Sequence, residues 1–274
     1  MKLAGTVLAL LACSASAFTQ PTAFRQSTAL FSAEEAAAAA KANVAGTPAA
    51  SKKDTNGIEL AAFESFGPQE LQRVQGTSRT TLAFNDPSQE VAQIYMESEG
   101  RPIKADCEVW IGPDWTPLKL NIYSEDGKLR PVQTLVGTRF QCANIDINNT
   151  GNIAFPLMAG GKYANADQVK TRMDILTAGQ SKYVEGGAIY SKPLPGDVNK
   201  VLVVLHTDTR QLNAKVELMS GPNNMKQEYE IFTNNGEKNS LYVIFNTPDF
   251  GTTVRIKNLA PHEFPCKAYI VPQE

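Results

Sequence analysis

The chain contains two copies of one sequence pattern. Segment 101–159 aligns without a gap to segment 210–268, an offset of 109 residues, and 12 of these 59 positions are identical. The register continues backwards through Ile94 and Val203 and, after one inserted residue, reaches Val74 and Val184. A repeat of this length indicates a duplicated domain of about 100 residues. The identical pairs are Arg101/Arg210, Ala105/Ala214, Glu108/Glu217, Gly112/Gly221, Pro113/Pro222, Ile122/Ile231, Gly127/Gly236, Thr138/Thr247, Asn149/Asn258, Phe155/Phe264, Pro156/Pro265 and Ala159/Ala268.

Short apolar runs recur through both copies, bounded by Gly, Pro, Asn and Asp. Many short runs separated by turn residues are typical of a β-sandwich or barrel. We therefore expect an all-β fold of two tandem homologous β-sandwich domains, spanning 58–163 and 164–274. The runs lie near 80–84, 91–96, 106–111, 118–123, 132–136, 144–148 and 153–158, and near 188–191, 200–205, 214–219, 227–232, 241–245, 253–257 and 264–271.

Turn signals repeat as well. Asp126-Gly127 and Asn235-Gly236 occupy equivalent positions, and such dipeptides favour tight hairpins whose central residues have positive φ. The sequence therefore predicts two equivalent hairpin turns. A second shared turn is marked by Gly112-Pro113 and Gly221-Pro222.

A stretch between the copies has helical rather than strand spacing. Val169, Met173 and Leu176 recur at intervals of three or four residues. We expect a short helix over Asn165–Leu176 to connect the copies, and Ile58–Phe66 is its expected counterpart before the first copy.

Large apolar residues also occupy the strand positions that point away from each predicted core. Alternation places Trp110 and Tyr123 on that face in the first copy, and Met219 and Phe232 at the equivalent positions of the second. An apolar outer face is typical of a surface that binds a partner. The alternative is that the copies pack these faces on each other or under the N-terminal segment.

The charged residues that are identical in both copies are one Arg and one Glu, with Arg101 and Glu108 matching Arg210 and Glu217. Such a pair could flank a binding groove. It could equally order a turn or an interface, which is the commoner role. Paired carboxylates for sugar hydrolysis are not excluded by the number of acids, but nothing singles out a pair.

Little else in the sequence points to chemistry. The 26 basic and 28 acidic residues give a net charge of −2, which excludes a strongly basic nucleic-acid binder. Phosphate-binding loops, nucleophile elbows and metal-binding motifs are missing from the sequence, and the two histidines, His206 and His262, have no repeat partners. We therefore expect no catalytic residues, no cofactor and no metal.

The N-terminus has the composition of a targeting sequence. Residues 1–17 combine Lys2, an apolar run and a small-residue cleavage site, as in a signal peptide. Residues 18–33 are rich in hydroxyl groups and free of acids, as in a plastid transit segment, and an Ala-rich linker follows over 34–57. Plain secretion is the alternative. No run approaches the roughly 20 apolar residues of a membrane span, so stable membrane insertion is not expected.

Cysteine usage favours plastid import over secretion. Removal of residues 1–17 leaves Cys107, Cys142 and Cys266, an odd and widely spaced set. A secreted disulfide scaffold usually has an even and denser set.

Segments of both copies resemble the diatom pyrenoid shell proteins. The segments that carry the resemblance are Arg101–Pro113, Arg210–Asn224, Val254–Asn258 and Glu263-Phe264-Pro265. The resemblance covers most of the chain after about residue 70, and the first copy departs from the pattern at Pro102, Asp114 and Trp115.

The resemblance implies a non-enzymatic structural protein at the pyrenoid periphery in the plastid stroma. Its partners would be further copies of itself, related shell proteins and the Rubisco matrix, in a sheet that encloses the pyrenoid and supports carbon concentration. A plastid carbohydrate-binding module is the first alternative, with Trp110, Trp115 and Tyr123 as sugar-stacking residues. A hydrolase is the second.

Overall fold

Sixteen antiparallel strands form two sheets in a computed structural model of the chain, which describes residues 60–112 and 115–273. These residues belong to a compact unit spanning 51–274. The expected signal peptide, transit segment and linker (1–57) lie outside the described residues, as do Pro113 and Asp114.

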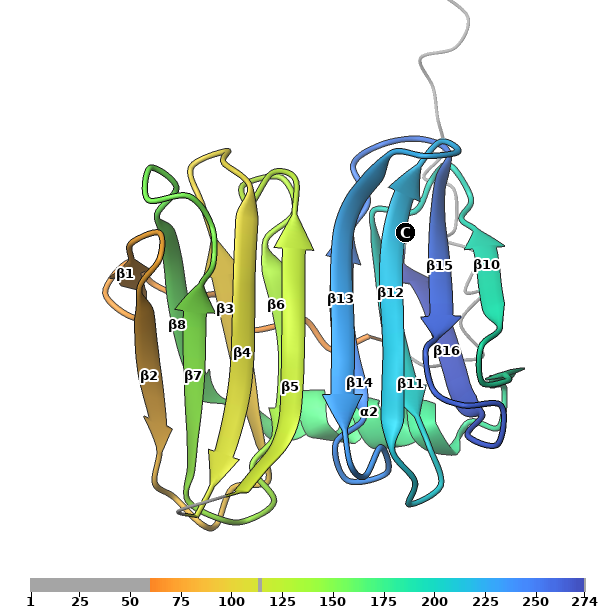
Figure 1. Ribbon diagram of the computed structural model, residues 1–274, viewed down its shortest axis with the longest axis horizontal. Coiled ribbons are helices and arrows are strands. Elements are labelled where there is room, and N and C mark those ends of the chain that lie inside the picture. Colours follow the sequence, from red (N-terminus) through yellow and green to blue (C-terminus); the bar gives the residue numbers. More distant parts are fainter. Residues whose placement is uncertain (1–59, 113–114, 274) are drawn as a thin grey trace, which may run out of the picture. The chain divides into compact units, whose positions relative to one another are not determined.

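Sheet A has the strand order β1-β8-β3-β6-β14-β11-β16-β9, and sheet B has the order β10-β15-β12-β13-β5-β4-β7-β2. The strands of sheet A are β1 (Gln72–Val74), β3 (Val91–Glu97), β6 (Val132–Gly137), β8 (Leu157–Tyr163), β9 (Lys182–Val184), β11 (Lys200–His206), β14 (Leu241–Asn246) and β16 (Cys266–Gln273). Those of sheet B are β2 (Arg79–Phe84), β4 (Ile103–Ile111), β5 (Trp115–Ser124), β7 (Ala143–Asn149), β10 (Ile189–Pro193), β12 (Leu212–Ser220), β13 (Met225–Thr233) and β15 (Thr252–Asn258). Figure 1 shows sheet B in front of sheet A.

The two sequence copies contribute equivalent strands. β3, β4, β6 and β7 of the first copy match β11, β12, β14 and β15 of the second at the offset of 109 residues. Each copy supplies four strands to each sheet, which confirms the all-β sandwich and the duplication. The sequence pattern missed the edge strands β1 and β9, because three residues are too few to show a period, and it began β8 four residues early.

The copies join edge to edge in both sheets. β5 pairs with β13 in sheet B, and β6 pairs with β14 in sheet A. The register pairs Asn121 with Glu230 and Thr134 with Val243, and the members of each pair are 109 residues apart. The copies are therefore related by an internal twofold axis that passes through both junctions, and the sheets run unbroken through the two halves.

Apolar side chains from the two sheets meet in a core that extends across both copies. Tyr229 of sheet B packs edge-on against Phe245 of sheet A beside the junction, with ring centroids 5.2 Å apart. Cys107 and Cys266 are buried in this core, and burial raises the pKa of each thiol to about 12. Both cysteines therefore act as small apolar groups.

The expected hairpins at Asp126-Gly127 and Asn235-Gly236 are wrong. Each dipeptide lies in a longer loop that crosses from sheet B to sheet A, and neither glycine has a positive φ. The glycines are required by close packing instead. A Cβ on Gly127 would lie 2.4 Å from Ser98 Oγ, and one on Gly236 would lie 2.3 Å from Thr207 Oγ1.

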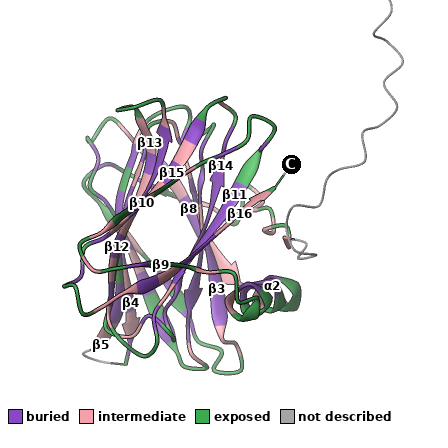
Figure 2. Cartoon of the chain, turned by 90° about the vertical axis from the view of Figure 1, so that its right-hand side faces the viewer, coloured by how far each residue is buried: buried purple, intermediate pink, exposed green. Residues whose placement is uncertain are grey.

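The predicted connecting helix is confirmed as α2 (Ala166–Thr177). Asn165 caps its first turn: the Asn165 side chain accepts from the Gln168 backbone N–H, and the Gln168 side chain accepts from that of Asn165. The helix covers the outer face of sheet A, as Figure 2 shows. No helix among the described residues is long and apolar enough to cross a membrane.

The expected counterpart of this helix before the first copy is wrong for its described part. Residues 60–66 form no helix and run across sheet A in irregular conformation. Phe63 stacks on Tyr242 with centroids 6.0 Å apart, and Phe66 stacks on Tyr95 at 5.3 Å. The outer face of sheet A is thus covered by two segments of the chain itself.

Candidate assembly surface

The outer face of sheet B lies on the other side of the molecule from α2 and residues 60–66. Within the described ranges no segment crosses this face (Figure 1). Its central strands β4 and β13, and β5 from Leu118 onward, alternate buried residues with partly or fully exposed ones, whereas β12 alternates only in its first half and is buried over 216–219. The alternation arises because even-numbered and odd-numbered residues of a strand point to opposite faces of its sheet.

All four apolar candidates lie on this face. Trp110 is on β4, Tyr123 on β5, Met219 on β12 and Phe232 on β13, and the residues on either side of Trp110, Tyr123 and Phe232 are buried. The two copies therefore do not pack these residues against each other. They display them side by side on one continuous sheet.

The four side chains differ in how far they are available to a partner. Phe232 is 43% exposed, whereas Met219 is only 5% exposed and lies under Arg255, whose Nη2 is 3.7 Å from its sulfur. Trp110 and Tyr123 are partly buried, and the Lys104 ammonium lies 5.9 Å from the Tyr123 ring centroid. Phe232 is thus the most accessible of the four.

Ion pairs surround the apolar residues. In the first copy Lys119 donates to Glu108 over 2.7 Å. In the second copy Lys215 lies 2.9 Å from Glu228 and 3.2 Å from Glu230. These pairs span neighbouring strands, so they reinforce the register of the sheet while leaving the face hydrophilic between its aromatic residues.

Glu217 is the most buried acid on this face. Burial opposes its ionisation, but hydrogen bonds from Lys257, at 2.7 Å, and from Arg255 outweigh burial and lower the pKa of Glu217. The equivalent Glu108 is more exposed and has a single cation partner, Lys119. The repeated glutamates therefore order strands in both copies, with unequal partners.

The repeated arginines order turns at the two ends of the sandwich. The Arg101 guanidinium lies 5.8 Å from the Phe155 ring centroid, and Arg210 lies 5.9 Å from Phe264 and donates to the Glu263 carbonyl. The repeated glycines Gly112 and Gly221 take positive φ values of 69° and 80°, as their turns require. Pro222 follows in an exposed bend, and Pro113 is outside the described residues.

A repeated asparagine, Asn149 in the first copy and Asn258 in the second, has the same structural role in both copies. Asn149 donates to the carbonyls of Val74 and Phe155, and Asn258 donates to those of Val184 and Phe264. Each buried amide thus hydrogen-bonds to an edge strand, β1 or β9, and to the loop that follows its own strand, β7 or β15. The presence of Asn at this position in both copies was the only sequence signal of this role, because the asparagines contact residues about 75 positions away.

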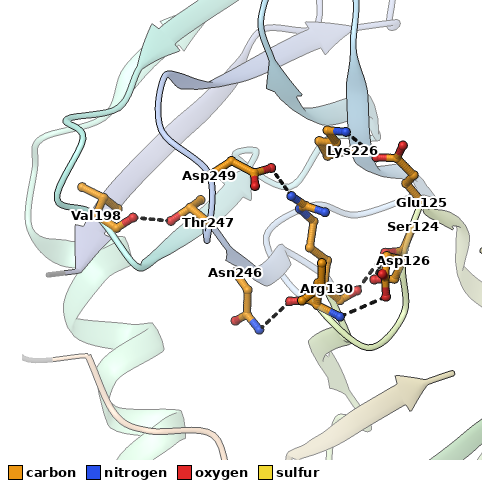
Figure 3. Close-up of polar contacts among 10 residues, drawn as sticks. Ser124, Glu125, Asp126, Arg130, Val198, Lys226, Asn246, Thr247 and Asp249 are labelled. Atoms are coloured by element: carbon orange, nitrogen blue, oxygen red, sulfur yellow. Dashed lines mark hydrogen bonds and ion pairs between the residues drawn. The ribbon is translucent and has the colours of Figure 1, made fainter. Parts of the chain in front are cut away.

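The junction between the copies is also held by polar contacts that no sequence pattern marks (Figure 3). Arg130 of the first copy, almost fully buried, pairs with Asp249 of the second. Beside it Lys226 contacts Glu125 at 2.6 Å. No repeat signal marks this pair, because the residue equivalent to Arg130 is Asn239, which instead accepts from Arg139 Nε at 3.0 Å.

Metal-ligating side chains do not gather in the described part of the chain, where no group of three or more His, Cys, Asp or Glu residues could hold an ion. His206 ends β11, 3.9 Å from Asp208, and burial lowers its pKa. His262 is exposed in a loop.

Comparison with known proteins gives the chain a family. A family model described as "Diatom pyrenoid shell protein" matches residues 66–272, from before β1 to the penultimate residue of β16. A search of curated proteins found no match. Because the match covers most of the chain and both halves of the sandwich, the chain belongs to the diatom pyrenoid shell protein family.

Proposed function

We propose that this protein is a non-enzymatic building block that assembles with itself and with related shell proteins into a sheet around the Rubisco-rich pyrenoid. The observation that carries the proposal is the uncovered outer face of sheet B in a member of the shell family. Sheet A is covered by its own chain, whereas sheet B presents Phe232 and Tyr123 on the two strands that join the halves. In this role the protein works at the pyrenoid periphery in the plastid stroma and supports carbon concentration and fixation.

The internal duplication suits assembly. A chain with two similar but unequal halves displays related surfaces in two orientations, so contacts between unlike halves need not close into a dimer. Contacts that do not close propagate into sheets or tubes. Each apolar side chain that enters such a contact contributes about 25 cal/mol per Å² of area removed from water, before ordering costs.

The structure favours this role over sugar binding. Trp115 is exposed, but the Arg139 guanidinium lies 4.6 Å from its ring centroid, so one face of the ring already has a partner. Trp110 is partly buried between its neighbours, and the equivalent residues of the second copy are Met219 and Asn224. A row of free aromatic rings, as sugar stacking requires, is therefore not repeated. A pulldown with storage glucan separates the two functions.

The test is assembly of the purified mature chain. We expect sheets or tubes in electron microscopy and a pelleted fraction that rises above a critical concentration. Phe232→Ala should raise that concentration, because truncation of a central interface aromatic commonly costs about 2 kcal/mol. Phe250→Ala is the matched control, since Phe250 is also exposed but lies in the loop between β14 and β15.

A wild-type chain that stays monomeric at high concentration in several buffers would contradict the proposal. In cells, a fluorescent fusion should form a ring around the pyrenoid. A diffuse stromal signal would argue against a shell, and co-pelleting with Rubisco tests contact with the matrix.

A further inference from the structure

Three pairs of equivalent charges on the outer face of sheet B have opposite signs in the two copies, whereas Glu108 and Glu217 have the same sign. Asp106 of β4 is equivalent to Lys215 of β12, and Lys119 of β5 is equivalent to Glu228 of β13. The same reversal relates Asp146 of β7 to Arg255 of β15. At these three positions, the axis that superimposes the two backbones places an acid of one half where the other half has a base.

The strand register arranges these charges in rows across the face. The row that contains the axis reads Lys257, Lys215, Glu230, Asn121, Asp106, Asn148 and Arg79 from β15 to β2. A neighbouring row reads Arg255, Glu217, Glu228, Tyr123 and Lys104 from β15 to β4. In the axial row, Lys215 and Asp106 are each one strand removed from the junction pair.

We propose that the outer face of sheet B binds the same face of a second copy of this chain, about a twofold axis parallel to the strands at the β5–β13 junction. The inference rests on the proposed self-assembly and specifies one of its contacts. In this arrangement a residue on one side of the junction faces the residue of the second copy that lies in the same row, at the same distance on the other side of the junction. Lys215 then faces the second copy's Asp106, and Glu217 faces its Lys104.

The charges select this axis over the other one in the plane of the sheet. An axis perpendicular to the strands would place each strand against the same strand of the second copy. Glu230 would then face Glu230, Lys215 would face Lys215 and Asp106 would face Asp106, and like charges in contact cost several kcal/mol. The axis parallel to the strands replaces the Lys215–Lys215 and Asp106–Asp106 repulsions with two Lys215–Asp106 attractions.

The distances suit the proposed pairing. Strands lie about 4.8 Å apart, so Asp106 and Lys215 are each about 7 Å from the junction axis. Packed sheets cross at about 30° and lie about 10 Å apart, so facing residues of the two sheets align most closely near the axis. The long side chain of Lys215 can reach the shorter one of Asp106 across that gap.

Both residues have capacity for a partner. No cation in the described part of the chain pairs with Asp106, and burial together with the charge of Glu108 raises the pKa of Asp106. Lys215 contacts two carboxylates, Glu228 and Glu230, and its ammonium has three donors. A contact between Lys215 and Asp106 of a second copy would give the Lys215 ammonium a third acceptor and the Asp106 carboxylate a cation partner.

Charge-reversal variants test the pairing. Asp106→Lys and Lys215→Glu should each raise the critical concentration about tenfold or more, because the changed contact occurs twice in each pair. A mixture of the two variants restores both contacts, since each lysine then meets an acid. We expect the equimolar mixture to assemble within about twofold of wild type. Asp174→Lys is the matched control, because it makes the same charge change on the exposed side of α2.

Three outcomes separate the inference from the proposed function. Rescue in the mixture supports the pairing. If wild type and both variants assemble alike, the pairing is overturned and the shell function stands. If wild type does not assemble at all, the shell function fails and the pairing fails with it.

Cross-linking provides a second test that does not depend on Lys215→Glu folding, since that variant places a third carboxylate beside Glu228 and Glu230. Asp106→Cys and Lys215→Cys, each combined with Cys142→Ser to remove the exposed thiol, are mixed and treated with a bismaleimide whose spacer spans about 10 Å, because that sheet separation exceeds the reach of a disulfide. A cross-linked dimer that forms in the mixture and in neither variant alone supports the pairing. Failure to cross-link in assembled sheets overturns it.

Discussion

Asn121 of β5 and Glu230 of β13 face each other at the point where the internal twofold axis passes through sheet B. They are 109 residues apart, so each is the equivalent of the other in the duplicated sequence. One amide and one carboxylate thus occupy a position that perfect symmetry would fill with two identical groups. Two glutamates there would repel across the strand pair, which gives a physical reason for the copies to differ.

The ion pair between Arg130 and Asp249 should couple the two halves. Removal of Asp249 leaves a nearly buried guanidinium without its carboxylate, so Asp249→Ala should lower the free energy of unfolding by about 1–3 kcal/mol. A double-mutant cycle with Arg130→Met in urea unfolding should give a coupling of at least about 1 kcal/mol.

The exposed pair Lys119–Glu108 is the control for that cycle. It lies within one copy and is open to solvent, so its coupling should stay below about 1 kcal/mol. Equal couplings for the two pairs would contradict the role assigned to Arg130.

Neighbouring glycines before β10 should respond differently to alanine. A Cβ on Gly186 would lie 1.8 Å from the Pro261 carbonyl oxygen, so Gly186→Ala must displace backbone and should cost about 3 kcal/mol. Gly187 has open space around it and a φ of +76°, so Gly187→Ala should cost only about 1–2 kcal/mol of backbone strain. Urea unfolding of both variants measures the difference, and the reverse order would refute the packing argument.

Glu217 should contribute to stability only above acid pH. Its pKa in the folded protein lies below the ordinary value of 4.5, so its contribution is fully present above that pH and is lost as pH falls through the lowered pKa. Glu217→Gln should therefore be less stable than wild type at neutral pH. Thermal unfolding across pH 2–7 should show the two curves converging in acid, and a constant difference would contradict the assignment.

Met219 and Phe232 should separate folding from assembly. Met219 is 5% exposed, so Met219→Ala should reduce the stability of the monomer by about 2 kcal/mol. Phe232 is 43% exposed, so Phe232→Ala should change monomer stability much less while weakening self-association. Melting below the critical concentration and sedimentation above it measure the two effects. A Phe232→Ala chain that unfolds would instead support a structural role for this residue.

The mature N-terminus should lie after residue 17 and before residue 57. The signal-peptide pattern and the acid-free segment 18–33 predict removal of at least residues 1–17. N-terminal peptide mapping of the native protein should recover no peptide from that range. An intact Met1 would contradict import.

Local patterns in the sequence predicted the strands and their faces. Alternation placed Trp110 and Tyr123 on the outer face, and the structure agrees. The helix over Ala166–Thr177 was predicted from spacing within its own residues. These features depend on neighbours a few positions apart, which a single sequence displays directly.

Only the tertiary structure decided how the copies join and which face stays uncovered. The pairing of β5 with β13 and the contact of Arg130 with Asp249 link residues more than 100 positions apart. The packing of residues 60–66 on sheet A links residues 29 positions apart in Phe66 and Tyr95, and 179 positions apart in Phe63 and Tyr242. The duplication made two equivalent halves predictable, but the same two halves could have packed face to face. The edge strands and side chains at the junction determine the choice, because their hydrogen bonds and buried charges are satisfied only when both sheets run through the axis.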